Sequence, residues 1–197
     1  MRCDKPVKAI DHEMKPEGTL IPFGILEVLQ KQFNVVYGDS RETSDFIVDA
    51  LELWWNERKN IYPTITSLQI DLDNGPELES HRTQFIKRLV EFSDTTRLSI
   101  ELVYYPPYHS KYNPVEHCWG VLESHWSGAV LLDWEAVYEW TRSMRWDGVA
   151  PNVYRLEGEY GTGVKLTKQE MRCLEKRIRR TKDIARWSVK IKPHLRV

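Results

Sequence analysis

Two acidic side chains occupy positions at which a protein can hold a divalent cation. Asp73 ends a β-prone run that begins at Ser67, and an Asn-Gly-Pro turn follows it. Glu116 comes shortly after Asn113 and Pro114, which should begin a helix because Asn is a favoured N-cap residue and proline suits the first helical position. Carboxylates are hard oxygen ligands of the kind that Mg²⁺ prefers. One acid at a strand end and one at a helix start therefore predict a metal site.

Each of these acids has an alternative interpretation. Asp71 lies on the same face of the strand as Asp73, because side chains alternate with a period of two, although the turn that follows favours Asp73. Glu116 could instead be the glutamate of a capping box, bonded back to the N-cap backbone. It lies about 100° from the apolar stripe of its helix, which places it beside the preceding loop rather than in the core. That stripe consists of Val115, Trp119, Leu122 and Trp126.

Two longer motifs surround these acids. Asp73-Asn74-Gly75-Pro76-Glu77 is followed by Pro106-Pro107-Tyr108-His109-Ser110-Lys111-Tyr112-Asn113-Pro114-Val115-Glu116-His117. In this order the motifs resemble the second half of a DDE transposase catalytic domain. The family that they resemble in particular is that of Rhodopirellula-type insertion-sequence transposases, distant relatives of the mariner-like elements. The resemblance extends from about Lys8 to about Pro193.

The resemblance implies a ribonuclease H-like α/β fold, with a mixed sheet flanked by helices. It also implies DNA cleavage and strand transfer at insertion-sequence ends. Such enzymes hold two divalent ions, Mg²⁺ or Mn²⁺, between three carboxylates; one ion activates the attacking water or 3′-hydroxyl, and the other stabilises the leaving oxygen. By the match of motifs, Asp73 is the second acid and Glu116 the third, and both are expected to be catalytic residues and metal ligands.

The first acid of the family has no counterpart here. In the family it lies on the first, central strand of the sheet, and nothing in this chain matches that segment. We therefore expect an N-terminally truncated domain that lacks its first strand, with weak metal affinity and negligible cleavage. Asp11, after a short apolar run, is an alternative first acid. Unpaired sheet edges would favour association, so a homodimer and a complementing upstream transposase segment are both expected partners.

The basic residues of the chain are concentrated at its C-terminal end. Between Lys165 and Val197 there are twelve Lys and Arg residues and three acids, a net charge of +9, which leaves −10 for the remainder of a chain whose total is −1. One basic face is enough to neutralise DNA phosphates. The residues expected to contact DNA are His109, Lys111, Tyr112, Lys176, Arg177, Arg179 and Arg180. The alternatives are a solvated charged face for the tail, and packing beneath the loop for Tyr108 and Tyr112.

The spacing of apolar residues predicts the order of the elements. We expect a hairpin over 21–29 and 32–37, a helix over 43–60, the strand that ends at 73, a helix over 79–93, a strand over 99–105 and then the helix of Glu116. Helices over 133–144 and 167–180 follow, separated by a glycine-rich break. Alternating strands and helices predict an α/β sheet with parallel members. We expect an irregular lead-in over 1–20, a partial catalytic core over 21–130 and a helical, basic extension over 131–197.

The composition narrows the class of protein. With 41% hydrophobic residues and eight Trp the chain should pack a core, and it contains neither a long apolar run nor an apolar N-terminal segment. Three widely spaced cysteines fit a reducing cytoplasm. The resemblance to transposases implies a bacterial, nucleoid-associated protein, and we expect no membrane partner. A catalytically dead DNA-binding protein is the alternative function. A third possibility is an α/β hydrolytic enzyme that uses Asp73 with His109 or His117, but the chain lacks a Gly-x-Ser-x-Gly elbow.

Overall fold

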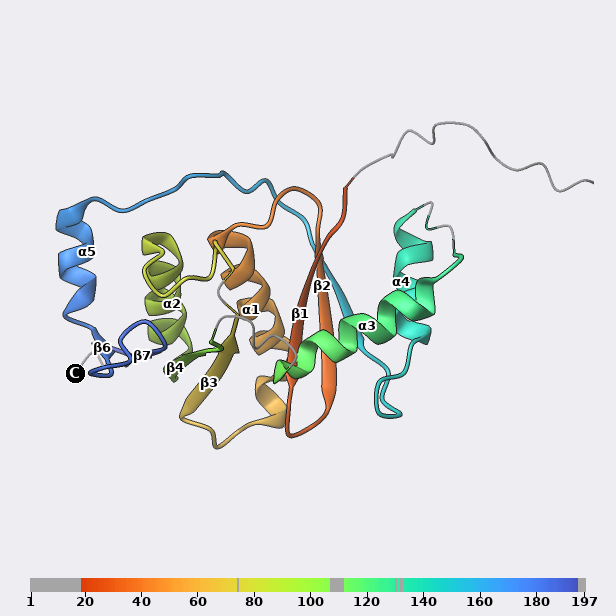
Figure 1. Ribbon diagram of the computed structural model, residues 1–197, viewed down its shortest axis with the longest axis horizontal. Helices are drawn as coiled ribbons and strands as arrows, with labels where there is room; N and C mark the ends of the chain where they lie inside the picture. Colours follow the sequence, from red (N-terminus) through yellow and green to blue (C-terminus); the bar gives the residue numbers. More distant parts are fainter. Residues whose placement is uncertain (1–18, 74, 107–111, 130, 132, 195–197) are drawn as a thin grey trace, which may run out of the picture.

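The computed structural model describes residues 19–73, 75–106, 112–129, 131 and 133–194 of the chain. These residues form a mixed α/β structure, as expected (Figure 1). Its elements are β1 (Ile21–Glu27), β2 (Gln32–Gly38), α1 (Ser44–Arg58), a 3₁₀ turn (Lys59–Ile61), β3 (Ser67–Leu72), α2 (Thr83–Thr96), β4 (Ser99–Tyr104), α3 (Pro114–Trp126), α4 (Trp134–Ser143), β5 (Asn152–Leu156), α5 (Lys168–Glu175), β6 (Ile178–Arg180) and β7 (Ser188–Ile191). Among the described helices, none has the length and apolar character needed to cross a membrane.

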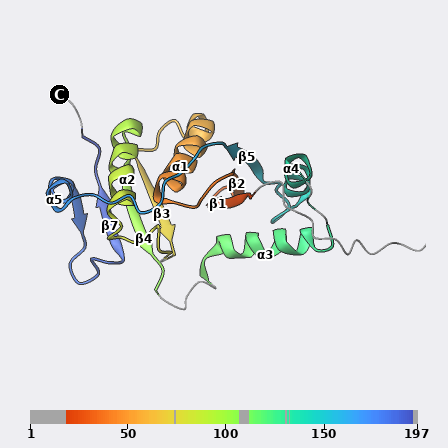
Figure 2. The same ribbon diagram turned by 90° about the horizontal axis from the view of Figure 1, so that it is seen from above.

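The strands form two sheets. In the first, β1 pairs antiparallel with β2, and β2 pairs parallel with β5. In the second, β3 pairs parallel with β4, β4 pairs antiparallel with β7, and β7 pairs antiparallel with β6. Figures 1 and 2 show the sheets next to one another, with edge strand β1 of one facing edge strand β3 of the other. The predicted hairpin and the predicted parallel pairing are both confirmed.

Helices α1 and α2 cover one face of this layer (Figure 2). The α1 helix begins where predicted, because the hydroxyl of Thr43 accepts a hydrogen bond from the backbone of Phe46. Its buried face includes Phe46, Ile47, Leu51 and Trp54. Arg88 of α2 bonds to Asp45 at 3.0 Å and Asp49 at 2.6 Å and so connects the two helices.

Helix α3 lies on the opposite face of the layer (Figure 2). Pro114 begins it as predicted, but the Asn113 side chain makes no cap hydrogen bond, so the capping-box interpretation of Glu116 is not met. Trp119 of α3 packs against β1 at Gly24, where an added Cβ would lie 2.6 Å from the indole. The absence of a side chain at Gly24 therefore allows the helix to approach the strand.

The C-terminal third differs from the expected helical tail. The capping box of Thr167 and Glu170 is present, but α5 ends at Glu175 rather than near Arg180. β6 and β7 follow, and Val189 and Ile191 of β7 are fully buried in the same core as α1 and α2. Alternation of buried and exposed residues along β7 explains the strand. The division at residue 130 remains a prediction, although β5 and β7, which lie after it, pair with strands before it.

Candidate active site

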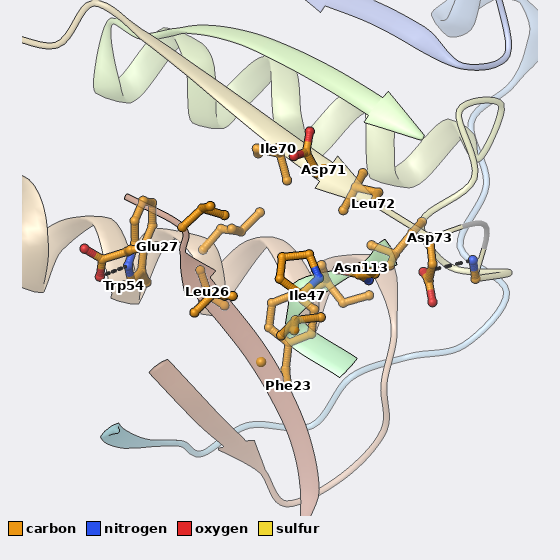
Figure 3. A pocket seen from close by; sticks show the side chains of 18 of the residues that line it. Phe23, Leu26, Glu27, Ile47, Trp54, Ile70, Asp71, Leu72, Asp73 and Asn113 are labelled. Atoms are coloured by element: carbon orange, nitrogen blue, oxygen red, sulfur yellow. Dashed lines mark hydrogen bonds between the residues drawn. The ribbon is translucent and has the colours of Figure 1, made fainter. Parts of the chain in front are cut away.

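A groove of about 1350 Å³ runs between β1 and β3 (Figure 3). Residues of β1 line one side and residues of β3 the other, while α1 and the beginning of α3 contribute the remaining walls. Both acids predicted from the sequence, Asp73 and Glu116, line this groove. The fold thus brings together two residues that are 43 positions apart in the chain.

Asp73 follows directly after β3, at one end of the groove (Figure 3). Its Oδ1 accepts a hydrogen bond from the backbone N–H of Gly75 at 3.2 Å, which is the turn chemistry that the Asn-Gly-Pro motif predicts. The side chain is exposed. Asp71 is also exposed and lines the groove, but its Oδ1 is bonded to Gln69 of the same strand at 2.7 Å. In each of the two residues Oδ1 accepts one hydrogen bond, so the preference for Asp73 rests on the motif that follows it.

Glu116 stands in the first turn of α3 and is exposed. Cys118 and Leu122 anchor this helix in the core, and Asn113, which precedes it, is buried and also lines the groove (Figure 3). Glu116 therefore lies at the start of a helix that buried residues hold in place, and it is one of the residues that line the groove. His117, a candidate acid–base partner, is exposed and is not among the groove-lining residues.

The end of the groove near Asp73 is strongly acidic. Glu42, which sequence analysis did not single out, lines the groove there, and loss of solvent together with the negative charges of Asp73 and Glu77 raises its pKa. Glu77 is compensated by Arg82, whose Nη2 lies 2.8 Å from its Oε2. A cation at this end would relieve the repulsion between Glu42 and Asp73. Only spatial proximity reveals Glu42, since nothing in its local sequence marks it.

The opposite end of the groove contains a buried carboxylate. Glu27 is 8% exposed and accepts hydrogen bonds from Arg58 at 2.8 and 3.0 Å, from Trp54 at 3.0 Å, from Asn34 at 2.9 Å and from Tyr62. Burial alone would raise the pKa of Glu27, but these bonds lower it below its ordinary value. The carboxylate is thus fully occupied, and it joins the hairpin to α1 rather than offering a ligand site.

Comparison with known protein families identifies the family to which this chain belongs. A family model described as "Rhodopirellula transposase DDE domain" matches residues 2–193, nearly the whole chain. The chain belongs to this family. Searches of curated proteins and of solved structures gave no significant match. The resemblance inferred from the two motifs is therefore confirmed, and transposase function and DNA as a partner follow at the level of the family.

The metal chemistry of the transposase family is only partly matched by the described residues. DDE transposases generally use divalent metal ions, and Asp73 and Glu116 are suitable donors on one groove. Within the described ranges, however, no group of three His, Cys, Asp or Glu side chains is arranged to hold a metal ion.

The residues expected to contact DNA in this transposase domain fall into three groups. His109 and Lys111 lie outside the described residues. Arg177 and Arg180 form internal bonds: Arg177 contacts Asp94 at 2.6 Å, and Arg180 contacts Glu175 at 3.0 Å. Tyr112, Lys176 and Arg179 are exposed, Tyr112 by 62%. Arg177 also lowers the pKa of Asp94 through its hydrogen bonds, which indicates a structural role.

Proposed function

We propose that this chain supplies the second and third catalytic acids of an insertion-sequence DDE transposase. Such an enzyme cleaves and transfers DNA strands at the ends of its element. The observation that carries the proposal is that Asp73 and Glu116, assigned by the family motifs, line the same groove. Asp73 and Glu116 would hold Mg²⁺ or Mn²⁺. Bound divalent ions would activate the attacking oxygen and stabilise the leaving oxygen of a phosphodiester.

We propose a ribonuclease H-like architecture with its first strand missing from the sheet. The order of hairpin, helix, strand, helix, strand and helix supports it, as does the open groove between edge strands β1 and β3. A third carboxylate on a strand in that groove would lie among β1, β3 and the start of α3. Completion by an upstream transposase segment and a homodimer are parts of the same proposal, as is a nucleoid-associated location.

DNA would approach the end of the groove that carries Asp73 and Glu116. Tyr112 lies just before α3 and presents an exposed ring on which a base could stack. Lys176 and Arg179 are exposed cations that could contact phosphates. Arg177 and Arg180 would position this surface, because their guanidinium groups are already bonded to Asp94 and Glu175. His109 and Lys111 remain candidates from the family motif.

Metal-dependent thermal unfolding tests the carboxylate site directly. Mg²⁺ or Mn²⁺ should raise the unfolding temperature of the wild-type chain, because a ligand of the native state stabilises it by about 2.7 kcal/mol at a hundred times its Kd. Asp73→Asn should abolish the rise. The matched control Asp71→Asn changes an acid two residues away on the same strand and should keep it. Equal metal responses in all three proteins would refute the assignment of Asp73.

A second candidate is a DNA-binding protein of the same family that no longer cleaves DNA. The incomplete set of metal donors among the described residues favours it. Gel-shift and cleavage assays on the same DNA distinguish the two functions. Salt-sensitive binding that Lys176→Ala and Arg179→Ala weaken, without Mn²⁺-dependent cleavage by the chain alone, would support the binding protein.

A further inference from the structure

The two strands that border the groove are both sheet edges. Among the described strands, β1 is paired with β2 and β3 with β4, so each has one edge without a described partner, and residues of both edges line the groove. In Figure 3 the labelled residues of β1 rise from Phe23 to Glu27, whereas those of β3 descend from Ile70 to Asp73, so the two strands run in opposite directions. A strand between them would pair parallel with one and antiparallel with the other.

Backbone donors and acceptors of β3 point into the groove. The carbonyl groups of Thr66 and Leu72 accept hydrogen bonds from β4-side backbone N–H groups, at Ser99 and Tyr105, each at 2.9 Å. The N–H and C=O of one strand residue point to the same side, and alternate residues point to opposite sides. Residues 67, 69 and 71 therefore direct their backbone groups away from β4 and toward β1. Such an edge is a template for pairing with another strand.

The groove offers apolar cover on both faces of such a strand. Ile47, Leu51 and Trp54 of α1 line one wall, and Val115 and Trp119 of α3 line another, on the opposite face of the layer (Figure 2). Phe23, Ile25, Leu68 and Ile70 from the two edges are only half-buried, although they pack against the main core. A strand of seven residues needs about 1,100 Å³ at the usual strand and sheet spacings, which matches the groove's 1350 Å³.

We propose that this groove binds an extended apolar segment of a second polypeptide, which enters as a strand between β1 and β3 and merges the two sheets into one. Because both of its faces would be covered, the segment should be almost continuously apolar and rich in Val and Ile. The chain's own residues 1–18 fit this poorly, since their longest apolar run is Ala9-Ile10.

Charge at the acidic end of the groove adds a second requirement. Asp73 and Glu42 line the groove close enough for their charges to interact, and Glu116 lines the same groove. A carboxylate carried by the inserted strand would be repelled here unless a divalent cation lies between the acids. This requirement rests on the proposed function, whereas insertion of the strand does not.

Peptide binding to the full chain tests the insertion. The probe is a fluorescent seven-residue peptide of alternating Val and Ile with one Asp at each end, so that either direction places a carboxylate near Asp73; binding is measured by anisotropy. Gln69→Pro removes a groove-side N–H without touching the β4 ladder, and should weaken binding about tenfold. Gln69→Ala is the matched control and should bind as the wild type does. Circular dichroism and thermal unfolding check that both variants fold.

The cation requirement is read from the same assay. Mg²⁺ should strengthen binding of the Asp peptide about tenfold, but not that of a peptide with Asn at each end, and Asp73→Asn should remove the effect. Binding with no Mg²⁺ effect would support the strand groove and count against the proposed metal site.

Two outcomes would overturn the strand groove itself. One is no binding of either peptide, or binding that Gln69→Pro leaves unchanged. The other concerns a double variant, Val7→Ser with Ile10→Ser, which makes the N-terminal segment less apolar. Peptide binding by this variant but not by the wild type would mean that the chain's own N-terminal segment fills the groove.

Discussion

Glu27 illustrates how a single residue can hold separate elements together. Its carboxylate ends β1, and its hydrogen-bond partners include Asn34 from β2 and Trp54 and Arg58 from α1. The side chain of Arg58 is 17% exposed, so both charges of the pair are largely shielded from water. A buried pair of this kind is sensitive to the loss of one partner, because the other charge is left without compensation.

Glu27→Gln should therefore lower the free energy of unfolding by about 3 kcal/mol, measured by urea denaturation. The matched control is Glu157→Gln, whose carboxylate is 71% exposed and pairs with Arg155. That exposed pair should contribute less than about 1 kcal/mol. Similar losses in both variants would show that the Glu27 network does not stabilise the fold.

The contribution of Glu27 should also depend on pH. The pKa of Glu27 is lower in the folded protein than its ordinary value of 4.5, so its stabilisation is complete above about pH 4.5 and is lost as the pH falls through the folded pKa. The difference in unfolding free energy between wild type and Glu27→Gln should shrink over that range. A difference that stays constant into strong acid would contradict the lowered pKa.

At the scale of elements, the contact between α3 and β1 fixes where Glu116 stands. It depends on Gly24, because an added Cβ there would lie 2.6 Å from Trp119 and 2.9 Å from Phe33. Gly120, in the same helix, has no atom within 4 Å of an added Cβ. Substitution by alanine should therefore change the stability of the protein in opposite directions at the two glycines.

We expect Gly24→Ala to destabilise the protein by about 1–3 kcal/mol through overpacking, and Gly120→Ala to stabilise it by about 0.5–1 kcal/mol through helix propensity. Thermal unfolding measures both. The metal response should weaken in Gly24→Ala if displacement of α3 moves Glu116. Equal effects of the two substitutions would contradict the close contact between helix and strand.

At the scale of the whole molecule, the last strands complete the main core rather than forming an appendage. Val189 and Ile191 of β7 have no exposed surface and pack with residues of α1, α2 and β4. Arg177, just before β6, bonds to Asp94 of α2. If the basic tail only bound DNA, its removal from the chain would leave the core intact.

A chain that ends at Lys176 should therefore lose cooperative unfolding, because its removal exposes β4 and the apolar residues beneath β7. Ile191→Ala in the full chain should cost about 2–5 kcal/mol, whereas Lys192→Ala, at an exposed position, should cost less than about 0.5 kcal/mol. Calorimetry distinguishes these cases. An unchanged transition in the shortened chain would show that the last strands form a separate extension.

The sequence alone determined the family and the helices and strands as far as α4. Periodic apolar residues, the Thr43 cap and the Pro114 start located the hairpin and the helices, because these signals act within a few residues. The two motifs around Asp73 and Glu116 identified the transposase family because each motif is a continuous run of residues that can be recognised without the fold.

Only the tertiary structure decided how these parts combine. The basic helical tail predicted from the sequence contains β6 and β7 instead, because β7 pairs with β4, 85 to 91 positions away, and this pairing overrides local helix propensity. Arg177 and Arg180 were expected to contact DNA. Their internal bonds to Asp94 and Glu175 form only on folding, and Asp94 is also distant in sequence from Arg177. The groove between β1 and β3, and with it the acidic environment of Glu42, exists only because two sheet edges face each other. Which strands lie at the edges follows from the topology, and no local pattern of residues specifies it.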